Sequence, residues 1–381
     1  MKKETYLYIV PRQNFFSEGY RGRVMHALGI AEGLYENGKE VHLVGGRDLR
    51  KFTNDIPEGV KLIEIEENGS KFFGYFSWYF KLLKKIRSLK KDTAYNCVVI
   101  RYAMSSYPAI LLICSMFKGI KKVIEVNLFG YQYYFKRGTF LNQAFAYFEN
   151  CLCNCFDVLY VVSDAMKEDS RTNAFNGLVV SIPNGASSKK INYKSSPESG
   201  GNTRLVYLGS LMDYWDYDPL IQAVNNSGEN YEFHVYGTGP KESYLKESLK
   251  CRENVFFNGR FSRNELGDIL NRETDILLLP PKTLSDMENS GGLSTKAFDY
   301  MTMELPILVP SDGELLNIYR DRFNSLVYDR NNWEEVNQSV DILSKDRELR
   351  ERLSENAHKQ FLENYSWRSR MKVLIDSVSI S

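Results

Sequence analysis

The chain has 381 residues, which is more than one compact hydrophobic core normally holds and enough for two domains. Its formal net charge is +1 with 25% charged residues, so the charge balance gives no global reason to expect a nucleic-acid partner. The N-terminus passes directly into an apolar stretch and no apolar run is long enough to cross a bilayer, so we expect a cytoplasmic protein without a cleaved signal peptide.

The first half of the chain alternates predicted strands with predicted helices. Apolar, β-branched runs of strand length occur at 6–10, 40–45, 61–65, 97–101, 122–126 and 158–163. An amphipathic helix is expected over His26–Asn37, where Gly38 supplies a left-handed C-cap. Alternation of this kind predicts a mostly parallel sheet with helices on both faces.

Two stretches in this half contain candidate ligand-binding residues. Gly22 and Arg23 lie in the loop expected between the first strand and its helix, which either faces a phosphate or is a plain flexible connection. The loop lacks the G-x-G-x-x-G spacing of dinucleotide-binding folds. Glu125 and Asn127 share one face of a strand at its carboxyl end, where they either contact a substrate or hydrogen-bond a loop.

Residues 71–91 are unusual in composition. Aromatic side chains crowd the first half of this segment, lysine and arginine crowd the second, and it contains no acid. Such a helix can lie in the headgroup layer of an anionic membrane, or its aromatic face can pack on the domain core. Because the aromatic residues surround the segment and do not form one stripe, we expect membrane contact. A second aromatic cluster, 129–140, extends the same expected surface.

Three of the six cysteines are spaced as Cys151, Cys153 and Cys155. On a helix this spacing points the three thiols in different directions, and no histidine lies nearby in the sequence. We therefore interpret them as free, buried thiols in a reducing compartment.

A linker divides the chain. Residues 188–202 are rich in Ser, Lys, Pro and Gly and separate an expected first domain, 1–187, from a second, 203–362. Strand-like runs then resume at 204–210, 232–240, 254–260, 275–281, 306–313 and 325–329. Glycines such as Gly209 and Gly237 follow these strands directly, and their repetition on one rim favours close approach of a ligand to the backbone. Two doubly wound domains in tandem are expected to share one cleft.

The segment Met287–Gly313 has the pattern of a loop, a helix, a buried strand and a glycine turn. Ser294 and Thr295 are good N-cap residues at the start of its amphipathic helix. A helix start presents free N–H groups and a partial positive charge, and Lys296 adds a full cation within the first turn. Asp299 adds an acceptor for a sugar hydroxyl. A diphosphate with an attached sugar fits this arrangement, as does an ordinary α/β crossover.

The ordered motifs of the chain resemble the GT-B glycosyltransferases of glycosyltransferase family 4 from end to end. The segments that carry the resemblance are "VVSDAMKEDS…SIPNGAS", "VYLGSL", "HVYGTGP", "NVFFNGRFSRNELGDIL", "DILLLPP", "STKAFDYMTMELPIL" and "ENYSWRSRMKVLI". The resemblance implies an α/β fold of GT-B type, with two Rossmann-like doubly wound domains facing across a cleft. It also implies that the C-terminal helix, 363–381, crosses back to complete the first domain.

The same resemblance implies that the nucleotide sugar binds the second domain and the acceptor binds the first. Lys296 would face the diphosphate, Asp299 the ribose hydroxyls, and the Arg260–Phe261 turn the base. Asn127 takes the place of a histidine near the reacting sugar, so Asn127, Glu125 and Lys296 are the expected catalytic residues. The expected donor-binding residues are Gly22, Arg23, Gly209, Ser210, Gly237, Arg260, Phe261, Glu288, Gly292, Leu293, Ser294, Thr295, Lys296 and Asp299.

The chain departs from the family pattern at several positions. The usual Glu-x7-Glu pair is reduced to Gly291 and Asp299, and Glu288 is the candidate for a displaced first carboxylate. The Arg and Lys that follow the first strand of the second domain are absent, and Ser210 begins an aromatic loop there. Glu304 stands where a glycine normally ends the key helix, at a cost of about 1 kcal/mol if a left-handed turn survives.

From these features we expect a hexosyltransferase-type enzyme. It would move a sugar from a nucleotide-diphosphate sugar to a glycan or lipid-linked acceptor, with retention, in synthesis of bacterial-type surface polysaccharide or glycoconjugate. Front-face attack needs no protein nucleophile, while cations and helix N–H groups stabilise the departing diphosphate. No metal and no cofactor are expected, and residues 71–91 would attach the enzyme to the inner face of the plasma membrane. The alternatives are a GT-B-like protein without turnover that binds a glycan or a partner, and a nucleotide-sugar epimerase of the same fold.

Overall fold

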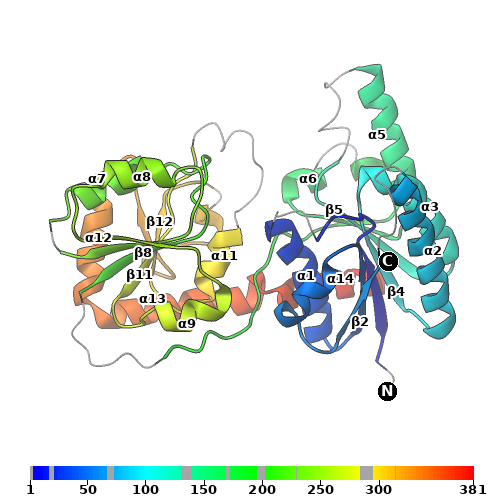
Figure 1. The fold of residues 1–381 in the computed structure, drawn as a ribbon, viewed down its shortest axis with the longest axis horizontal. Helices are drawn as coiled ribbons and strands as arrows, with labels where there is room; N and C mark the ends of the chain where they lie inside the picture. Colours follow the sequence, from blue (N-terminus) through cyan, green and yellow to red (C-terminus); the bar gives the residue numbers. More distant parts are fainter. Residues whose placement is uncertain are drawn as a thin grey trace. The chain divides into compact units, whose positions relative to one another are not determined.

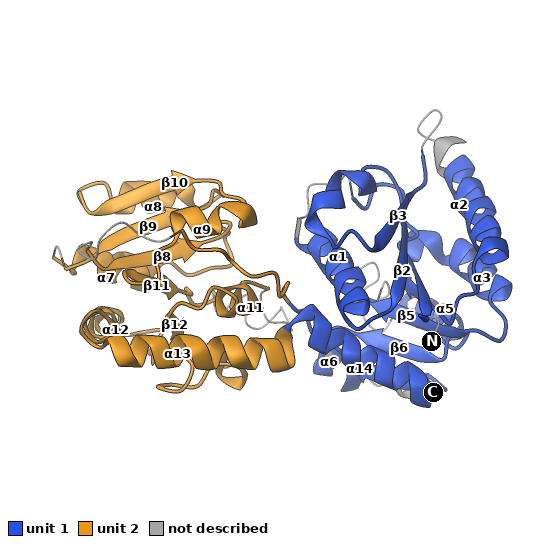
Figure 2. Ribbon diagram, turned by 90° about the horizontal axis from the view of Figure 1, so that it is seen from below, with its two compact units in different colours: residues 1–185, 366–381 blue, residues 186–365 orange. Residues whose placement is uncertain are grey.

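The computed structural model describes residues 3–16, 21–66, 73–129, 139–168, 172–194, 202–228, 230–283, 295–313 and 315–381. The chain forms two compact units (Figure 2). Unit 1 comprises residues 1–185 and 366–381, and unit 2 comprises residues 186–365. In each unit, helices cover both faces of a parallel sheet (Figure 1).

Unit 1 is built on a seven-stranded sheet in the order β3-β2-β1-β4-β5-β6-β7. Its strands are β1 (Thr5–Ile9), β2 (Glu40–Gly45), β3 (Val60–Glu64), β4 (Cys97–Arg101), β5 (Lys121–Val126), β6 (Val158–Val161) and β7 (Leu178–Ser181). Its described helices are α1 (Arg21–Glu36), α2 (Phe73–Asp92), α3 (Tyr107–Met116), α5 (Phe140–Cys153), α6 (Asp164–Glu168) and α14 (Trp367–Ile380). The strand order changes direction between β1 and β4, and in such sheets ligands bind beyond the carboxyl ends at that point.

The period-two alternation of β1 divides the core of unit 1 into two layers. Tyr6 and Tyr8 contribute to the layer under α1 and α14, whereas Leu7 and Ile9 contribute to the layer under α2, α3 and α5. In α2, the residues buried in that second layer are Trp78, Leu82, Ile86 and Leu89. One stripe of α2 therefore packs on the core, and among its described aromatic residues only Trp78 is fully buried, whereas Phe76 and Phe80 are exposed.

The C-terminal helix α14 packs directly on α1. A Cβ atom at Gly29 would lie 2.0 Å from Nε1 of Trp367, and one at Gly33 would lie 2.2 Å from the Trp367 carbonyl oxygen. Only glycine lets the two helices approach this closely. Trp367 and Met371 then fill the core layer under α1.

Unit 2 is built on a six-stranded sheet in the order β10-β9-β8-β11-β12-β13. Its strands are β8 (Arg204–Leu208), β9 (Glu232–Tyr236), β10 (Val255–Gly259), β11 (Asp275–Leu278), β12 (Ile307–Pro310) and β13 (Leu326–Tyr328). Its described helices are α7 (Asp218–Asn225), α8 (Glu242–Ser248), α9 (Leu266–Ile269), α11 (Thr295–Met301), α12 (Glu334–Lys345) and α13 (Arg347–Gln360). Here the order changes direction between β8 and β11.

The expected strands all occur, but three details differ from the sequence expectations. Strand β7 was not predicted, because Leu178–Ser181 is a four-residue stretch of intermediate burial. Helix α1 begins at Arg21, five residues before the predicted start, so Gly22 and Arg23 lie in its first turn and not in a loop. Cys151 and Cys155 are exposed, although they were expected to be buried, because α5 points the neighbouring thiols in different directions. Glu304 agrees with the expectation and adopts the left-handed conformation, with φ of 49°. In the part of the chain that the structure describes, no helix is both long and apolar enough to cross a membrane.

Candidate functional site

A buried carboxylate lies near the carboxyl ends of the central strands of unit 1. Glu125, in β5, has no exposed surface. It accepts hydrogen bonds from the Tyr8 hydroxyl of β1 at 2.6 Å, from Arg101 of β4 at 2.5 Å and from Nδ2 of Asn127 at 2.5 Å. Nε2 of His26, on α1, lies 3.0 Å from the same carboxylate. Four segments of unit 1 therefore converge on Glu125.

These contacts keep Glu125 ionised. Burial by itself would raise the pKa of this carboxyl, but the Arg101 guanidinium and the His26 contact outweigh burial and hold the pKa at about 2. A carboxylate this acidic is a weak base, and its burial keeps it from a substrate. The arrangement favours a positioning role for Glu125, which fixes the amide of the partly exposed Asn127.

His26 links this cluster to the segment that ends at residue 185 and to the C-terminal segment of unit 1. Its Nδ1 lies 2.6 Å from Oδ1 of Asn184, which belongs to the Pro-Asn-Gly segment. Its ring also meets Trp367 edge-on, with centroids 5.0 Å apart. The two segments that His26 contacts are those by which the chain leaves unit 1 and returns to it. Nothing in the local sequence around His26 indicated these contacts.

Gly22 and Arg23 lie in the first turn of α1, and a phosphate contact of this turn stays a prediction. A Cβ atom at Gly22 would meet no atom within 4 Å, so the position has open space around it. The Arg23 guanidinium lies over the Phe15 ring at 5.1 Å and donates to the Phe15 carbonyl at 3.3 Å. Arg101 lies over the same ring at 5.0 Å. Two cations of unit 1 therefore contact the Phe15 ring.

In unit 2, Lys296 lies at the carboxyl end of β8, beside the point where the strand order changes direction. Its ammonium donates to the Tyr207 hydroxyl at 2.5 Å and lies 3.8 Å from the centroid of that ring and 5.2 Å from that of Trp215. A Cβ atom at Gly209 would lie 2.7 Å from Nζ of Lys296. The structure thus brings together Gly209 and Lys296, two of the predicted donor-binding residues.

The surroundings of Lys296 change the pKa of its ammonium. Burial lowers the pKa of its ammonium well below the usual value, and the nearby carboxylate of Asp299 opposes this effect. Asp299 itself lies 3.6 Å from the Arg263 guanidinium, and 41% of its side-chain surface is exposed. Arg263 was not predicted, although the Ser-x-x-Glu capping box formed by Ser262 and Glu265 fixes its position.

The other predicted donor-binding residues that the structure describes lie along the same edge of unit 2. A Cβ atom at Gly237 would lie 1.9 Å from the Gly209 carbonyl oxygen, so the approach of a neighbouring loop already requires glycine there. Ser210 is exposed, and its carbonyl accepts from the Tyr207 hydroxyl at 2.8 Å. Arg260 is exposed and donates to Thr238 at 3.1 Å. The ring of Phe261 packs near Tyr236, with centroids 6.4 Å apart.

Several predicted residues lie outside the described part of the chain. They are Glu288, Gly291, Gly292, Leu293 and Ser294. Thr295 is the first residue of α11. The roles expected for the residues outside the described ranges stay predictions.

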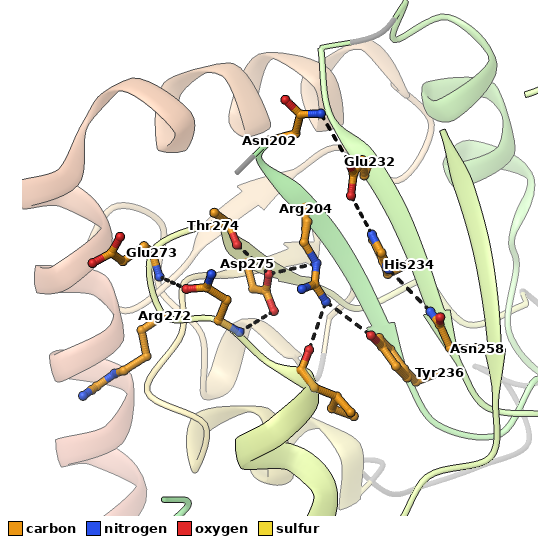
Figure 3. Close-up of polar contacts among 12 residues, drawn as sticks. Asn202, Arg204, Glu232, His234, Tyr236, Asn258, Arg272, Glu273, Thr274 and Asp275 are labelled. Carbon is orange, nitrogen blue, oxygen red and sulfur yellow. Dashed lines mark hydrogen bonds and ion pairs between the residues drawn. The ribbon is translucent and has the colours of Figure 1, made fainter. Parts of the chain in front are cut away.

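A separate polar cluster lies toward the opposite, amino end of the unit 2 sheet (Figure 3). Arg204, the first residue of β8, lies 3.2 Å from the buried carboxylate of Asp275 and donates to Tyr236 at 3.3 Å. Next to it, His234 lies 2.9 Å from the carboxylate of Glu232. Because ligands of parallel sheets bind at the carboxyl ends, we interpret this cluster as structural.

Among the described residues, no group of three or more His, Cys, Asp or Glu side chains is arranged to hold a metal ion.

Comparison with known proteins covers both units. The chain matches the family described as Glycosyltransferase Family 4 over residues 20–190 and the family described as Glycosyl transferases group 1 over residues 188–360. An uncharacterized glycosyltransferase of Methanocaldococcus jannaschii is 25% identical over 386 residues, spanning 94% of this chain and 94% of that protein. The crystal structure of a Rickettsia africae glycosyltransferase aligns with a TM-score of 0.66 at 14% identity over 100% of this chain and 99% of the other. Anabaena HepE in complex with UDP aligns with a TM-score of 0.64 at 12% identity over 99% and 100%.

Proposed function

Because the chain is a GT-B-fold glycosyltransferase that resembles glycosyltransferase family 4, we propose that it transfers a hexose from a nucleotide-diphosphate sugar to a glycan or lipid-linked acceptor. We further propose that the transfer retains the anomeric configuration and serves surface polysaccharide or glycoconjugate synthesis. A nucleotide-sugar donor is supported by similar structures described as complexes of Anabaena HepE with UDP and with UDP-glucose.

The observation that carries this proposal is the position of Lys296. Its ammonium lies beside Gly209 at the edge of the unit 2 sheet where parallel sheets bind ligands. When the sugar departs, negative charge grows on the diphosphate, and a desolvated cation stabilises that charge more strongly than a solvated one. Asp299, three residues further along α11, would accept from the ribose hydroxyls, with Arg263 holding its carboxylate.

In unit 1, Asn127 is the proposed contact to the reacting sugar or the acceptor. Its amide is oriented by Glu125, whose charge is in turn fixed by Arg101. We propose no protein nucleophile, since in front-face attack the acceptor proton passes to the departing diphosphate. Glu125 then acts through Asn127 and does not itself touch the substrate.

A panel of UDP-, GDP- and other nucleotide sugars tests the proposal by thermal shift and by product formation with candidate acceptors. At least one nucleotide should stabilise the wild type, and Lys296→Ala should weaken its binding by tenfold or more, about 1.4 kcal/mol. The matched control, Lys246→Ala, removes an exposed ammonium on α8 and should change nothing. Unaltered binding by Lys296→Ala would contradict the assigned phosphate role, and stabilisation by no nucleotide would favour a binding protein without turnover.

The pH dependence of donor binding provides a second test. A bound diphosphate favours the charged form of Lys296, whereas burial in the free protein disfavours it. Donor binding should therefore take up a proton, and the Kd should rise as the pH rises through the lowered pKa. Lys296→Arg, whose charge does not titrate in this range, should flatten that dependence.

We also propose that α2 attaches unit 1 to an anionic membrane. The second half of α2 exposes Lys84, Lys85, Arg87 and Lys91. Each such cation adds about 1 kcal/mol of attraction to an anionic leaflet. Glutamine at these four positions should abolish flotation with anionic vesicles, and equal flotation would exclude this role for α2.

A further inference from the structure

Helix α5 exposes large apolar side chains and buries two polar residues. Its large exposed side chains, with 55–81% of their surface accessible, are Phe140, Leu141, Tyr147 and Phe148. These positions recur at helical spacing on one side of the helix. On the buried side, Asn142 is 5% exposed and Glu149 is 1% exposed, and the Tyr102 hydroxyl donates to Glu149. The same buried side also carries Ala146, Leu152 and Cys153, so α5 has apolar residues on both sides and its exposed apolar face lacks a partner within the described residues.

The neighbouring helices α3 and α2 also expose large apolar residues. The Tyr107 hydroxyl of α3 donates to the Phe148 carbonyl of α5 at 3.0 Å, and Lys90 of α2 donates to the Met116 carbonyl of α3. Figures 1 and 2 both show α2 beside α3 in unit 1. The exposed residues of the three helices, which we name the apolar belt, are Phe76, Phe80, Leu111, Leu112, Phe140, Leu141, Tyr147 and Phe148.

The charge distribution around the apolar belt favours a lipid surface over a second copy of the chain. Helix α5 contains one charged residue, the buried Glu149. The adjacent α2 carries exposed cations, and of its residues only Asp92 is acidic. In a two-fold dimer through the belt, these cations would approach the same cations of the partner. At an anionic leaflet they would instead meet headgroup phosphates while the aromatic side chains enter the layer beneath.

We propose that the apolar belt inserts into the boundary between headgroups and acyl chains of an anionic membrane, with α5 as the inserting helix. The inference rests on the proposed membrane contact of α2 and adds the element that enters the bilayer. Insertion places unit 1, the proposed acceptor side, at the surface where a lipid-linked acceptor resides. It requires no nucleotide, so its failure is distinguishable from failure of the donor assignment.

The exposed free cysteines provide matched probes. Cys151 lies on α5 and Cys251 lies in unit 2, and both are exposed. An environment-sensitive fluorophore is placed at Cys151 in a Cys155→Ser/Cys251→Ser background, and at Cys251 in a Cys151→Ser/Cys155→Ser background. With phosphatidylcholine–phosphatidylglycerol vesicles, the Cys151 label should shift to the blue and be quenched by nitroxides in the acyl chains. The Cys251 label should do neither, and an unresponsive Cys151 label on bound protein would overturn the proposal.

A variant tests the energetic contribution of the belt. Phe140→Ser/Tyr147→Ser/Phe148→Ser should reduce vesicle partitioning by roughly tenfold per side chain. The loss should persist at high salt, which screens the α2 cations but not apolar contact. The control, Leu316→Ser/Phe323→Ser, removes comparably exposed apolar groups from unit 2 and should bind as the wild type does.

Circular dichroism and nucleotide-induced thermal shift establish that the α5 variant is folded. Unchanged partitioning of that folded variant would overturn the proposal. The proposal would also be overturned if the wild type did not bind vesicles and sedimented as a dimer while the α5 variant sedimented as a monomer. That result would assign the apolar belt to a second copy of the chain.

Discussion

Replacing Glu125 with glutamine tests whether the buried charge cluster stabilises unit 1. The substitution keeps the size of the side chain but removes the negative charge that faces Arg101 and His26. Removing one partner of a buried ion pair costs about 3–5 kcal/mol, because the other charge stays desolvated. We expect the free energy of unfolding of unit 1 to fall by about 3–5 kcal/mol at neutral pH.

The pH dependence gives an independent estimate of the size of the effect. The pKa of Glu125 is about 2 in the folded chain, against an ordinary value of 4.5. A carboxyl whose folded-state pKa is depressed contributes stability that is fully present above its unfolded pKa and is lost as the pH falls toward the folded pKa. That contribution is about 3 kcal/mol, and it should decline between about pH 4.5 and pH 2 in the wild type. Glu125→Gln should lack this decline.

Denaturant unfolding followed by tryptophan emission measures both effects. Each unit contains two of the four tryptophans, so phenylalanine at Trp215 and Trp333 leaves only the signal of unit 1. Glu58→Gln, at an exposed position, is the matched control and should change little. A loss below about 1 kcal/mol at neutral pH, or a loss of the same size at neutral pH and at about pH 3, would refute the reasoning.

Three further substitutions have definite expected outcomes. Arg204→Ala removes the cation paired with the buried Asp275 and should destabilise unit 2 by about 3–5 kcal/mol, measured by urea unfolding. Gly33→Ala places a methyl group against the Trp367 carbonyl and should cost about 1–3 kcal/mol of unit 1 stability, despite the higher helix propensity of alanine. At Glu304, glycine and alanine both remove the carboxylate, but only glycine relieves the left-handed strain. The free energy of unfolding of Glu304→Gly should therefore exceed that of Glu304→Ala by about 1 kcal/mol, and its melting temperature should be higher. Equal melting temperatures for those two variants would contradict the strain argument.

The strands and their order along the chain were predictable because they depend on local composition. Apolar runs such as 40–45 and 97–101 coincide with observed strands, and the bounds of β2 and β4 match them residue for residue. The left-handed residue at position 304 was also predictable, since a turn must follow the helix before the next buried strand can begin. Strand β7 was missed because its residues are only partly buried and give a weak pattern.

The candidate site also has a part that the sequence predicted and a part that it did not. Lys296 and Asp299 were identified from spacing within one helix, and that spacing is a property of the sequence. Their surroundings were not predictable, because Tyr207 lies 89 residues from Lys296 in the chain and meets it only when β8 and α11 pack together. The pairing of Asp299 with Arg263 depends likewise on tertiary packing.

The α/β alternation, the two-domain organisation and the resemblance to glycosyltransferase family 4 were predictable from the chain alone, because periodicity and motif order do not depend on packing. Which charges are buried and which apolar groups stay exposed depends on how the elements pack in three dimensions. In the sequence, Glu125 has no feature that separates it from other carboxylates at strand ends. Its contacts with Tyr8, Arg101 and His26 form only in the folded chain. Helix α5 has apolar residues on two sides, and only the structure shows that the side with Leu152 faces the core while the side with Phe140 is exposed. Burial is set by long-range contacts, so it cannot be read from neighbours in the chain.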